Sequence, residues 1–168
     1  MDLKEALKEA LHFEEEGYEL YKEAAETSFH PGVKKVFEFL AKEELNHVAT
    51  LKNFIDSEGH TDELKSEGSS FDETEEFFNM TKEEFLHGIE FSEDETQALE
   101  KAVKLEESAH DYYIAHHENA ETDELKKFFA FIVEQEKAHF QMLSRMVEFS
   151  KNPDAFKNDL EKFKFVKE

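Results

Sequence analysis

This chain has no cysteine and no tryptophan, and only two prolines and five glycines among its 168 residues. Without cysteine it cannot form a disulfide framework, a thiolate zinc site or a cysteine-ligated iron centre. The scarcity of helix breakers, beside abundant glutamate, lysine, alanine and leucine, predicts helices almost throughout. Because a chain of this length forms one domain with a substantial core, we expect a single all-α domain over residues 1–168.

Long hydrophobic runs and an excess of basic side chains are also absent. No apolar stretch approaches the ~20 residues that a membrane-spanning helix needs. The first residues, Met1 to Glu5, lack the basic segment and apolar run of a signal peptide, so we expect a soluble cytoplasmic protein. Lysine and arginine total 20 against 42 aspartates and glutamates, a formal net charge of −22. Such acidity opposes binding to nucleic acids and to anionic membranes, and we expect neither partner.

Four long segments show the apolar periodicity of helices. They run over about 2–28, 33–58, 93–120 and 123–150. The break at His30-Pro31-Gly32 separates the first two, and the sequence from Ser92 to Glu95 forms a capping box at the start of the third.

The connection over residues 59–91 is too long for a bare loop. We expect a crossover with one or two short helices, one of them starting at the capping-box pattern of Thr81 and Glu84. One long link between short ones predicts a four-helix bundle with a single crossover between helices 2 and 3. The tail, residues 153–168, predicts a short helix whose phenylalanines pack on the bundle or on a partner subunit.

Two Glu-x-x-His tetrads occur in the second and fourth helices, and each is preceded by one more glutamate in the preceding helix. The second set follows the first by 92 residues at every position: Glu14, Glu44 and His47 become Glu106, Glu136 and His139. A single Glu-x-x-His in so acidic a chain is usually a solvated pair on a helix surface. Two matched sets inside apolar stripes instead predict one site built from a duplicated helix pair.

Residues three or four apart share a helix face, so four helices would direct four carboxylates and two imidazoles to one place. Burying these carboxylates without compensation costs several kcal/mol per ion. Protonation relieves part of that cost, and two metal cations relieve it more directly. Carboxylate and imidazole ligands suit iron or manganese, and bridging carboxylates hold two metals ~3.5–4 Å apart.

These six residues resemble the ligand pattern of the ferritin-like diiron-carboxylate superfamily, most closely its rubrerythrin branch. The resemblance covers nearly the whole chain apart from the tail and part of the crossover. It implies a ferritin-like bundle that forms a homodimer and holds two iron ions per subunit. It also implies the ligand roles: bridging by Glu44 and Glu136, terminal ligation by Glu14 and Glu106, and one iron each for His47 and His139.

Two tyrosines, Tyr21 and Tyr113, lie seven residues after Glu14 and Glu106. The resemblance implies that their hydroxyls donate hydrogen bonds which orient carboxylates. Ordinary buried aromatics fit the pattern equally well.

The sequence departs from the rubrerythrin pattern in two places. It has none of the cysteines of a rubredoxin domain, so a separate electron donor, such as a rubredoxin-like protein, is implied. Ala109 stands where rubrerythrins carry a further glutamate, three residues after Glu106, that takes part in redox-linked iron movement. Its loss opposes a rubrerythrin-like peroxidase cycle. His110, one turn beyond Glu106, is a possible seventh ligand.

Three classes of function fit this pattern. The first is a non-haem diiron oxidoreductase that reduces hydrogen peroxide or dioxygen. The second is iron handling, in which Fe(II) is oxidised and then stored or delivered. The third is a non-enzymatic helical interaction module whose buried acids are relics. A manganese-loaded site is a variant of the first, since ligand type barely separates iron from manganese.

Overall fold

The computed structural model describes residues 3–56 and 68–166, and in these ranges it contains helices and no strand. The elements follow one another in the order α1 Leu3–Thr27, α2 Pro31–Asp56, α3 Phe71–Leu86, α4 Glu93–Glu118, α5 Asp123–Lys151, α6 Pro153–Asn158 and the short 3-10 helix η1 Leu160–Phe163. The prediction of an all-α fold is confirmed.

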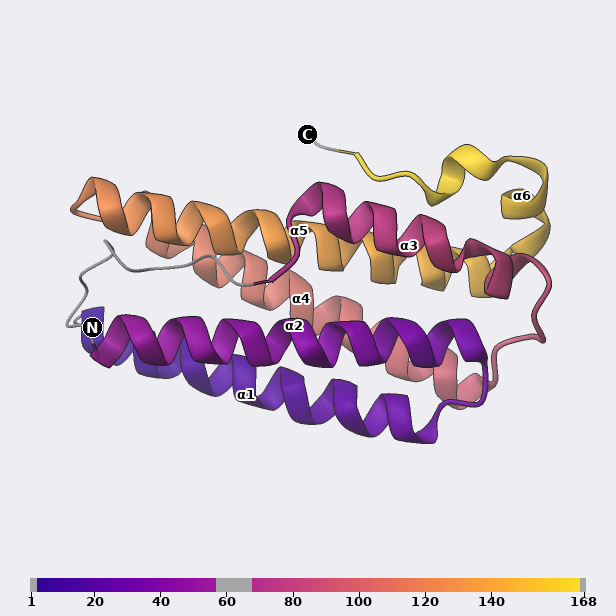
Figure 1. The fold of residues 1–168 in the computed structure, drawn as a ribbon, viewed down its shortest axis with the longest axis horizontal. Coiled ribbons are helices and arrows are strands. Elements are labelled where there is room, and N and C mark those ends of the chain that lie inside the picture. Colours follow the sequence, from indigo (N-terminus) through magenta and orange to yellow (C-terminus); the bar gives the residue numbers. More distant parts are fainter. Residues whose placement is uncertain (1–2, 57–67, 167–168) are drawn as a thin grey trace.

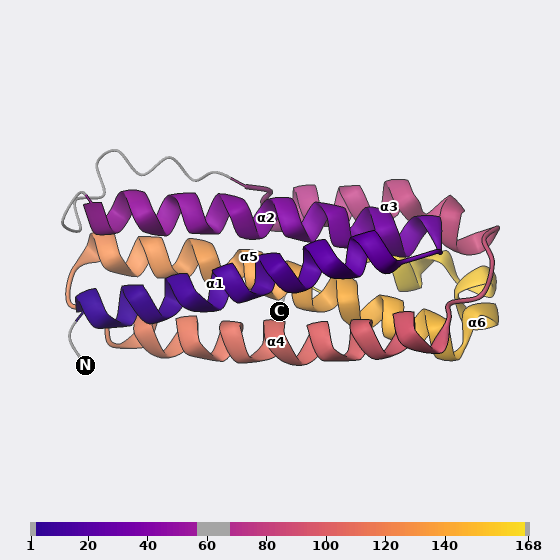
Figure 2. The same cartoon turned by 90° about the horizontal axis from the view of Figure 1, so that it is seen from below.

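Four long helices form the bundle, and they run side by side in both views (Figures 1 and 2). Helices α1 and α2 pack as one antiparallel hairpin, and α4 and α5 pack as a second. The chain crosses from the end of α2 to the start of α4, and the helix within this crossover, α3, packs on α5 and α2. The predicted four-helix bundle with one long crossover is therefore confirmed.

Local sequence signals set the ends of these helices. Before α4, the Ser92 hydroxyl accepts from the Glu95 backbone N–H at 3.1 Å. The Glu95 carboxylate accepts from the Ser92 N–H at 3.0 Å, as the capping box predicts. The second helix begins at Pro31, two residues earlier than expected. Proline is well tolerated in a first turn, where its missing N–H has no helical partner. The His30 ring caps this end, since its Nδ1 accepts from the Gly32 N–H at 3.0 Å.

The crossover differs from its prediction at one point. A single helix of 16 residues begins at Phe71, and the Ser70 hydroxyl caps it by accepting from the Glu73 N–H at 3.1 Å. The helix start expected at Thr81 is wrong: Thr81 lies inside α3, and its hydroxyl donates to the Phe78 carbonyl at 2.8 Å. Residues 57–67 of the expected crossover lie outside the described residues.

Two apolar clusters fill the bundle, one toward each end. One contains Phe37, Leu40 and Leu99 together with phenylalanines of α3 and the tail. The other contains Leu7, Phe54 and Ile132. In the bundle helices the predicted ligands fall between the residues of these two clusters, except that Ala138 of the first cluster precedes His139 in α5. A polar layer therefore lies in an otherwise apolar interior.

The tail packs on its own bundle. Phe156 and Phe163 are almost fully buried, and their rings contact Phe149 and each other, while Phe163 also contacts Phe78 of α3. Among the described residues, no helix is both long enough and apolar enough to cross a membrane.

Candidate metal centre

The six predicted ligands meet at the middle of the bundle, one each from α1 and α4 and two each from α2 and α5. None is more than 4% exposed. They form two groups, and in each group the ligand atoms lie within 4.8 Å of one another: Glu14, Glu44, His47 and Glu136 in the first, and Glu44, Glu106, Glu136 and His139 in the second. Each group could hold a metal ion, and Glu44 and Glu136 belong to both.

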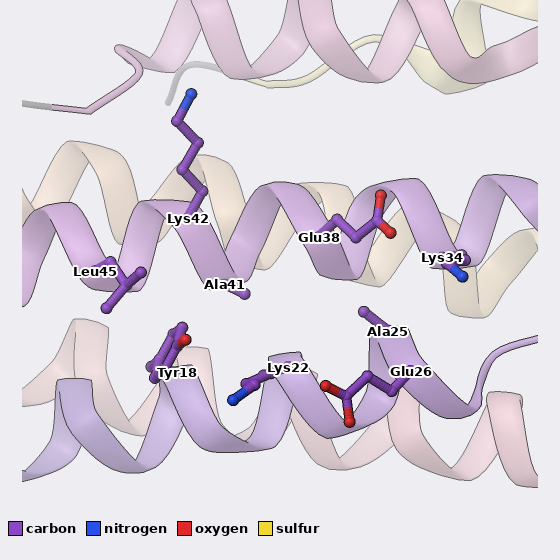
Figure 3. A pocket seen from close by; sticks show the side chains of 9 residues that line it. All are labelled: Tyr18, Lys22, Ala25, Glu26, Lys34, Glu38, Ala41, Lys42 and Leu45. Carbon is purple, nitrogen blue, oxygen red and sulfur yellow. The ribbon is translucent and has the colours of Figure 1, made fainter.

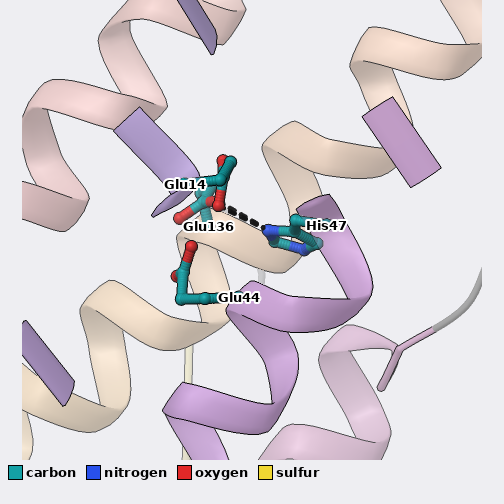
Figure 4. Close-up of side chains that lie close together, drawn as sticks. All are labelled: Glu14, Glu44, His47 and Glu136. Carbon is teal, nitrogen blue, oxygen red and sulfur yellow. Dashed lines mark hydrogen bonds and ion pairs between the residues drawn. The ribbon is translucent and has the colours of Figure 1, made fainter. Parts of the chain in front are cut away.

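The first group contains a buried ion pair (Figure 4). His47 Nδ1 lies 3.1 Å from Glu14 Oε2 and 3.2 Å from Glu136 Oε1. Burial alone would raise the pKa of Glu14, but the His47 charge and hydrogen bonds from its neighbours lower it to about 2. Burial likewise opposes protonation of His47, yet the adjacent Glu14 and Glu136 raise its pKa well above the usual range. This half of the site therefore balances a carboxylate against an imidazolium.

The second group lacks such compensation. His139 Nδ1 lies 3.8 Å from Glu106 Oε1 and 3.9 Å from Glu136 Oε2, too far for hydrogen bonds. Burial and the carboxylate of Glu136 raise the pKa of Glu106 well above its usual range. Burial and the charge of His47 lower the pKa of His139 to about 3, which keeps the imidazole neutral.

Several buried atoms at the site have no hydrogen-bond partner among the described residues. They are Glu106 Oε2, both carboxylate oxygens of Glu136 and both ring nitrogens of His139. Of these, Glu136 Oε1 has only the ion-pair contact with His47. Orphaned polar atoms in an interior are costly and require an explanation. Metal ligation satisfies all of these atom types at once, and the donor set fits iron or manganese.

Tyr21 and Tyr113, which are 92 residues apart, bond to carboxylates of the opposite helix pair. Tyr113 on α4 donates to Glu14 Oε1 at 2.6 Å, and Tyr21 on α1 donates to Glu106 Oε1. Both rings are fully buried, and burial followed by the nearby carboxylates raises the pKa of each phenol well above 10.0. Both hydroxyls therefore stay protonated and act as donors.

Two polar residues at the site escaped the sequence prediction. Gln135 and Glu43 directly precede Glu136 and Glu44, and both are buried. Gln135 Oε1 lies 2.6 Å from His47 Nε2. The available signal was the 92-residue offset, because Gln135 follows Glu43 by that interval.

A small cavity of about 10 Å³ adjoins the carboxylates between α1 and α4. That volume accommodates about one water-sized molecule. Gly17 and Ala109, again 92 residues apart, line it. A Cβ on Gly17 would lie only 3.2 Å from Oε2 of Glu44, so the glycine keeps space beside this carboxylate.

His110, the possible seventh ligand, is not brought into either group. Its side chain is 26% exposed, and its Nδ1 lies 3.7 Å from the Asp111 carboxylate.

A separate, open groove of about 370 Å³ lies between α1 and α2 (Figure 3). Tyr18, Lys22 and Leu45 are among its lining residues, and none of the six predicted ligands reaches it.

The fold and site together define a helical bundle with a buried carboxylate–histidine cluster that could hold metal. Comparison with protein families gives a match to the rubrerythrin family over residues 5–147, a range that includes all six predicted ligands. The chain therefore belongs to the rubrerythrin family, within the ferritin-like diiron-carboxylate superfamily. Searches among curated proteins and among solved structures gave no match.

Proposed function

We propose that this protein is a diiron oxidoreductase that reduces hydrogen peroxide or dioxygen. The observation that carries the proposal is the sharing of Glu44 and Glu136 by both groups of potential ligands. Two carboxylates common to two adjacent positions are what a bridged pair of metals requires. In this assignment Glu14 and His47 complete one position, and Glu106 and His139 complete the other.

Two iron ions bound there would supply the electrons and the O–O bond cleavage, chemistry that belongs to the cofactor. The protein itself would hold the metal ions and orient the carboxylates that ligate them. The phenols of Tyr21 and Tyr113 fix one oxygen of Glu106 and of Glu14. The second oxygen of each carboxylate would ligate metal, and that of Glu14 pairs with His47 Nδ1 in this structure. The apolar clusters on both sides exclude bulk water, and the small cavity beside Gly17 marks the side on which an oxidant would approach the carboxylates.

The electrons must come from outside this chain, since it has no cysteine for a cysteine-ligated iron centre. A small redox protein of the rubredoxin type is the donor we propose. Homodimerisation and a cytoplasmic location are part of the same proposal. The first is implied by the family, and the second is the expectation from the sequence.

Iron oxidation with storage or delivery is the second candidate. The observation that favours it is Ala109, which lines the cavity where a further carboxylate would serve a peroxidase cycle. Fe(II) would then be the substrate and the electron source, and no protein donor would be needed.

The metal content of the protein separates the two iron-dependent functions from a manganese site and from a non-enzymatic helical module. Elemental analysis of protein purified without tags or chelators should find about two irons per subunit; two manganese ions would instead support a manganese site. Anaerobic reduction followed by hydrogen peroxide or by dioxygen then shows which oxidant is consumed faster. Uptake of iron well beyond two per subunit would favour storage. Absence of any metal, with no uptake of Fe(II) or Mn(II), would leave only a non-enzymatic helical module.

A further inference from the structure

The two halves of the site differ in the hydrogen bonding of the histidine nitrogen, Nε2, that points away from the carboxylates. The 92-residue offset pairs Gln135 with Glu43 and His47 with His139. From this relationship we expect each residue that precedes a shared glutamate to bond the histidine of the opposite half.

Gln135 makes that bond. Its Oε1 lies 2.6 Å from His47 Nε2, so this ring nitrogen carries a hydrogen and Nδ1 faces the carboxylates. An outer partner of this kind fixes the tautomer and orientation of a ligating histidine. With Nε2 held by Gln135, Nδ1 is the nitrogen through which His47 would ligate a metal.

Among the described residues, Glu43 makes no equivalent bond to His139, and both of its carboxylate oxygens accept from Ser69 of the crossover. The Ser69 N–H donates to Glu43 Oε2 at 2.8 Å, and its hydroxyl donates to Oε1 at 3.0 Å. The Ser69 carbonyl also accepts from Gln135 Nε2 at 3.1 Å. His139 is fully buried, and neither of its ring nitrogens has a hydrogen-bond partner in the part of the chain that the structure describes.

Glycine is required beside Ser69 for this contact. Gly68 has φ of +110°, and a Cβ there would lie 2.8 Å from Gln135 Nε2 and 3.0 Å from Glu43 Oε2. The segment therefore rests directly on the two residues that the offset pairs. No second crossover exists in the other half of the bundle, so this contact breaks the internal symmetry.

We propose that Ser69 is a positioning residue that competes with His139 for the Glu43 carboxylate and so weakens metal binding at the position of Glu106 and His139. This inference rests on the proposed two-metal site. When His139 ligates through Nδ1, its Nε2–H needs an acceptor. The acceptor that the 92-residue offset assigns to it is Glu43, whose two oxygens already accept from Ser69. Loss of such an outer partner costs 10–100-fold in metal affinity.

The test is an anaerobic titration of metal-free protein with Co(II), followed by visible absorption and calorimetry. Cobalt reports ligation without the redox reactions of iron. The wild type should bind two Co(II) per subunit, and His139→Ala identifies the step that belongs to the His139 position. Ser69→Ala removes the hydroxyl bond to Glu43 Oε1 and keeps the backbone N–H bond to Oε2, so it frees one carboxylate oxygen. This variant should strengthen the step by about 10-fold and leave the other step unchanged.

Three further substitutions, one of them also combined with Ser69→Ala, test whether the gain comes from the Ser69–Glu43 contact. Ser69→Thr retains both donors and should bind Co(II) as the wild type does. Ser70→Ala removes the α3 cap without touching Glu43, and it should also leave both steps unchanged. Glu43→Leu should have little effect alone, but it should abolish the gain from Ser69→Ala in the double variant.

Each alternative result has a separate meaning. Two Co(II) ions bound with no effect of Ser69→Ala, or a gain that survives Glu43→Leu, would overturn the competition and leave the two-metal site intact. Fewer than two Co(II) ions per wild-type subunit would overturn the proposed function itself. If Ser70→Ala strengthens the step as much as Ser69→Ala, general loosening of the crossover explains the gain and the proposal is wrong.

Discussion

Tyr113 on α4 donates a hydrogen bond of 2.6 Å to the Glu14 carboxylate on α1. The reverse bond, from Tyr21 on α1 to Glu106 on α4, completes a crossed pair at the same level of the bundle. Each tyrosine therefore contacts the glutamate of the other half rather than its own. The crossed bonds join the two helix hairpins at the site and fix the orientation of the Glu14 and Glu106 carboxylates.

Replacing Tyr113 with phenylalanine removes the donor and leaves a buried Glu14 oxygen unsatisfied. We expect the free energy of unfolding of the metal-free protein to fall by about 1–3 kcal/mol. Urea denaturation measures this loss. Tyr18→Phe is the control, because Tyr18 lies in the outer groove, and it should change stability by less than about 0.5 kcal/mol. Equal stability of wild type and Tyr113→Phe would show that the bond contributes nothing.

Replacing Glu136 with alanine removes the oxygens common to both ligand groups. Bound metal should fall from two ions per subunit to one or none, because each position loses a ligand and the bridge is lost. Elemental analysis measures the ratio. The matched control is Glu134→Ala, an exposed glutamate on the same helix, which should keep both metals. If Glu136→Ala also retains two metals, Glu136 does not bridge them.

Adding a side chain at Gly17 should displace the Glu44 carboxylate, because Gly17 lines the small cavity beside it. The Cβ of Gly17→Ala would lie 3.2 Å from Cδ and Oε2 of Glu44, so this carboxylate must shift by a few tenths of an ångström. We expect stopped-flow oxidation of the reduced protein by hydrogen peroxide to slow by about 10-fold, since small misplacements at reacting centres are costly. Ala109→Gly removes a methyl group from the opposite wall of the cavity and should not slow the oxidation. An unchanged rate in Gly17→Ala would contradict a role for this cavity in access.

The tail should stabilise the bundle through Phe163. This ring is fully buried against Phe78 and Phe149, so Phe163→Ala should cost about 3–5 kcal/mol. Chemical denaturation measures the loss. Leu160→Ala, nearby but 48% exposed, should cost far less. Similar losses in both variants would mean that the tail is not packed as described.

The stability of the metal-free protein should depend on pH through Glu106. Its pKa is raised in the folded state above 4.5, first by burial and then by Glu136. The stabilisation from protonated Glu106 is therefore fully present below pH 4.5 and is lost as the pH rises through the folded-state pKa. We expect the loss to approach ~1.4 kcal/mol per pH unit within that window.

Glu106→Gln isolates this contribution, since glutamine cannot ionise. Its unfolding free energy should fall less steeply than that of the wild type between pH 5 and pH 8. His139 has the opposite effect, because its lowered pKa makes stability fall with acidification from 6.5 toward about 3, and both proteins share this term. Parallel pH profiles for the two proteins would show that Glu106 does not titrate as described.

The ligand cluster was predictable because it depends on spacing. Helical periodicity places Glu44 and His47 on one face, and the 92-residue repeat carries the same arrangement to Glu136 and His139. The prediction needed only that four amphipathic helices bury their apolar stripes together. The capping box at Ser92 was equally local, and it holds in the structure.

The contacts of the crossover were not predictable in this way. Ser69 bonds to Glu43 over 26 residues and to Gln135 over 66, and no periodicity relates a loop residue to helices so far away. The start of α3 was misplaced for a related reason. Thr81 and Glu84 satisfy the local capping pattern, but Ser70 provides an earlier start, and packing of Phe71 and Phe78 favours the longer helix.

The sequence alone determined which side chains face the interior, because helix geometry repeats over a few residues and needs no distant contact. It thereby determined the all-α fold and the layer of carboxylates and histidines. Only the tertiary structure decided which histidine has an outer partner, that each tyrosine bonds across to the opposite hairpin, and that the tail packs on its own bundle. These outcomes depend on how separate helices and loops pack against one another, and local spacing carries no information about that.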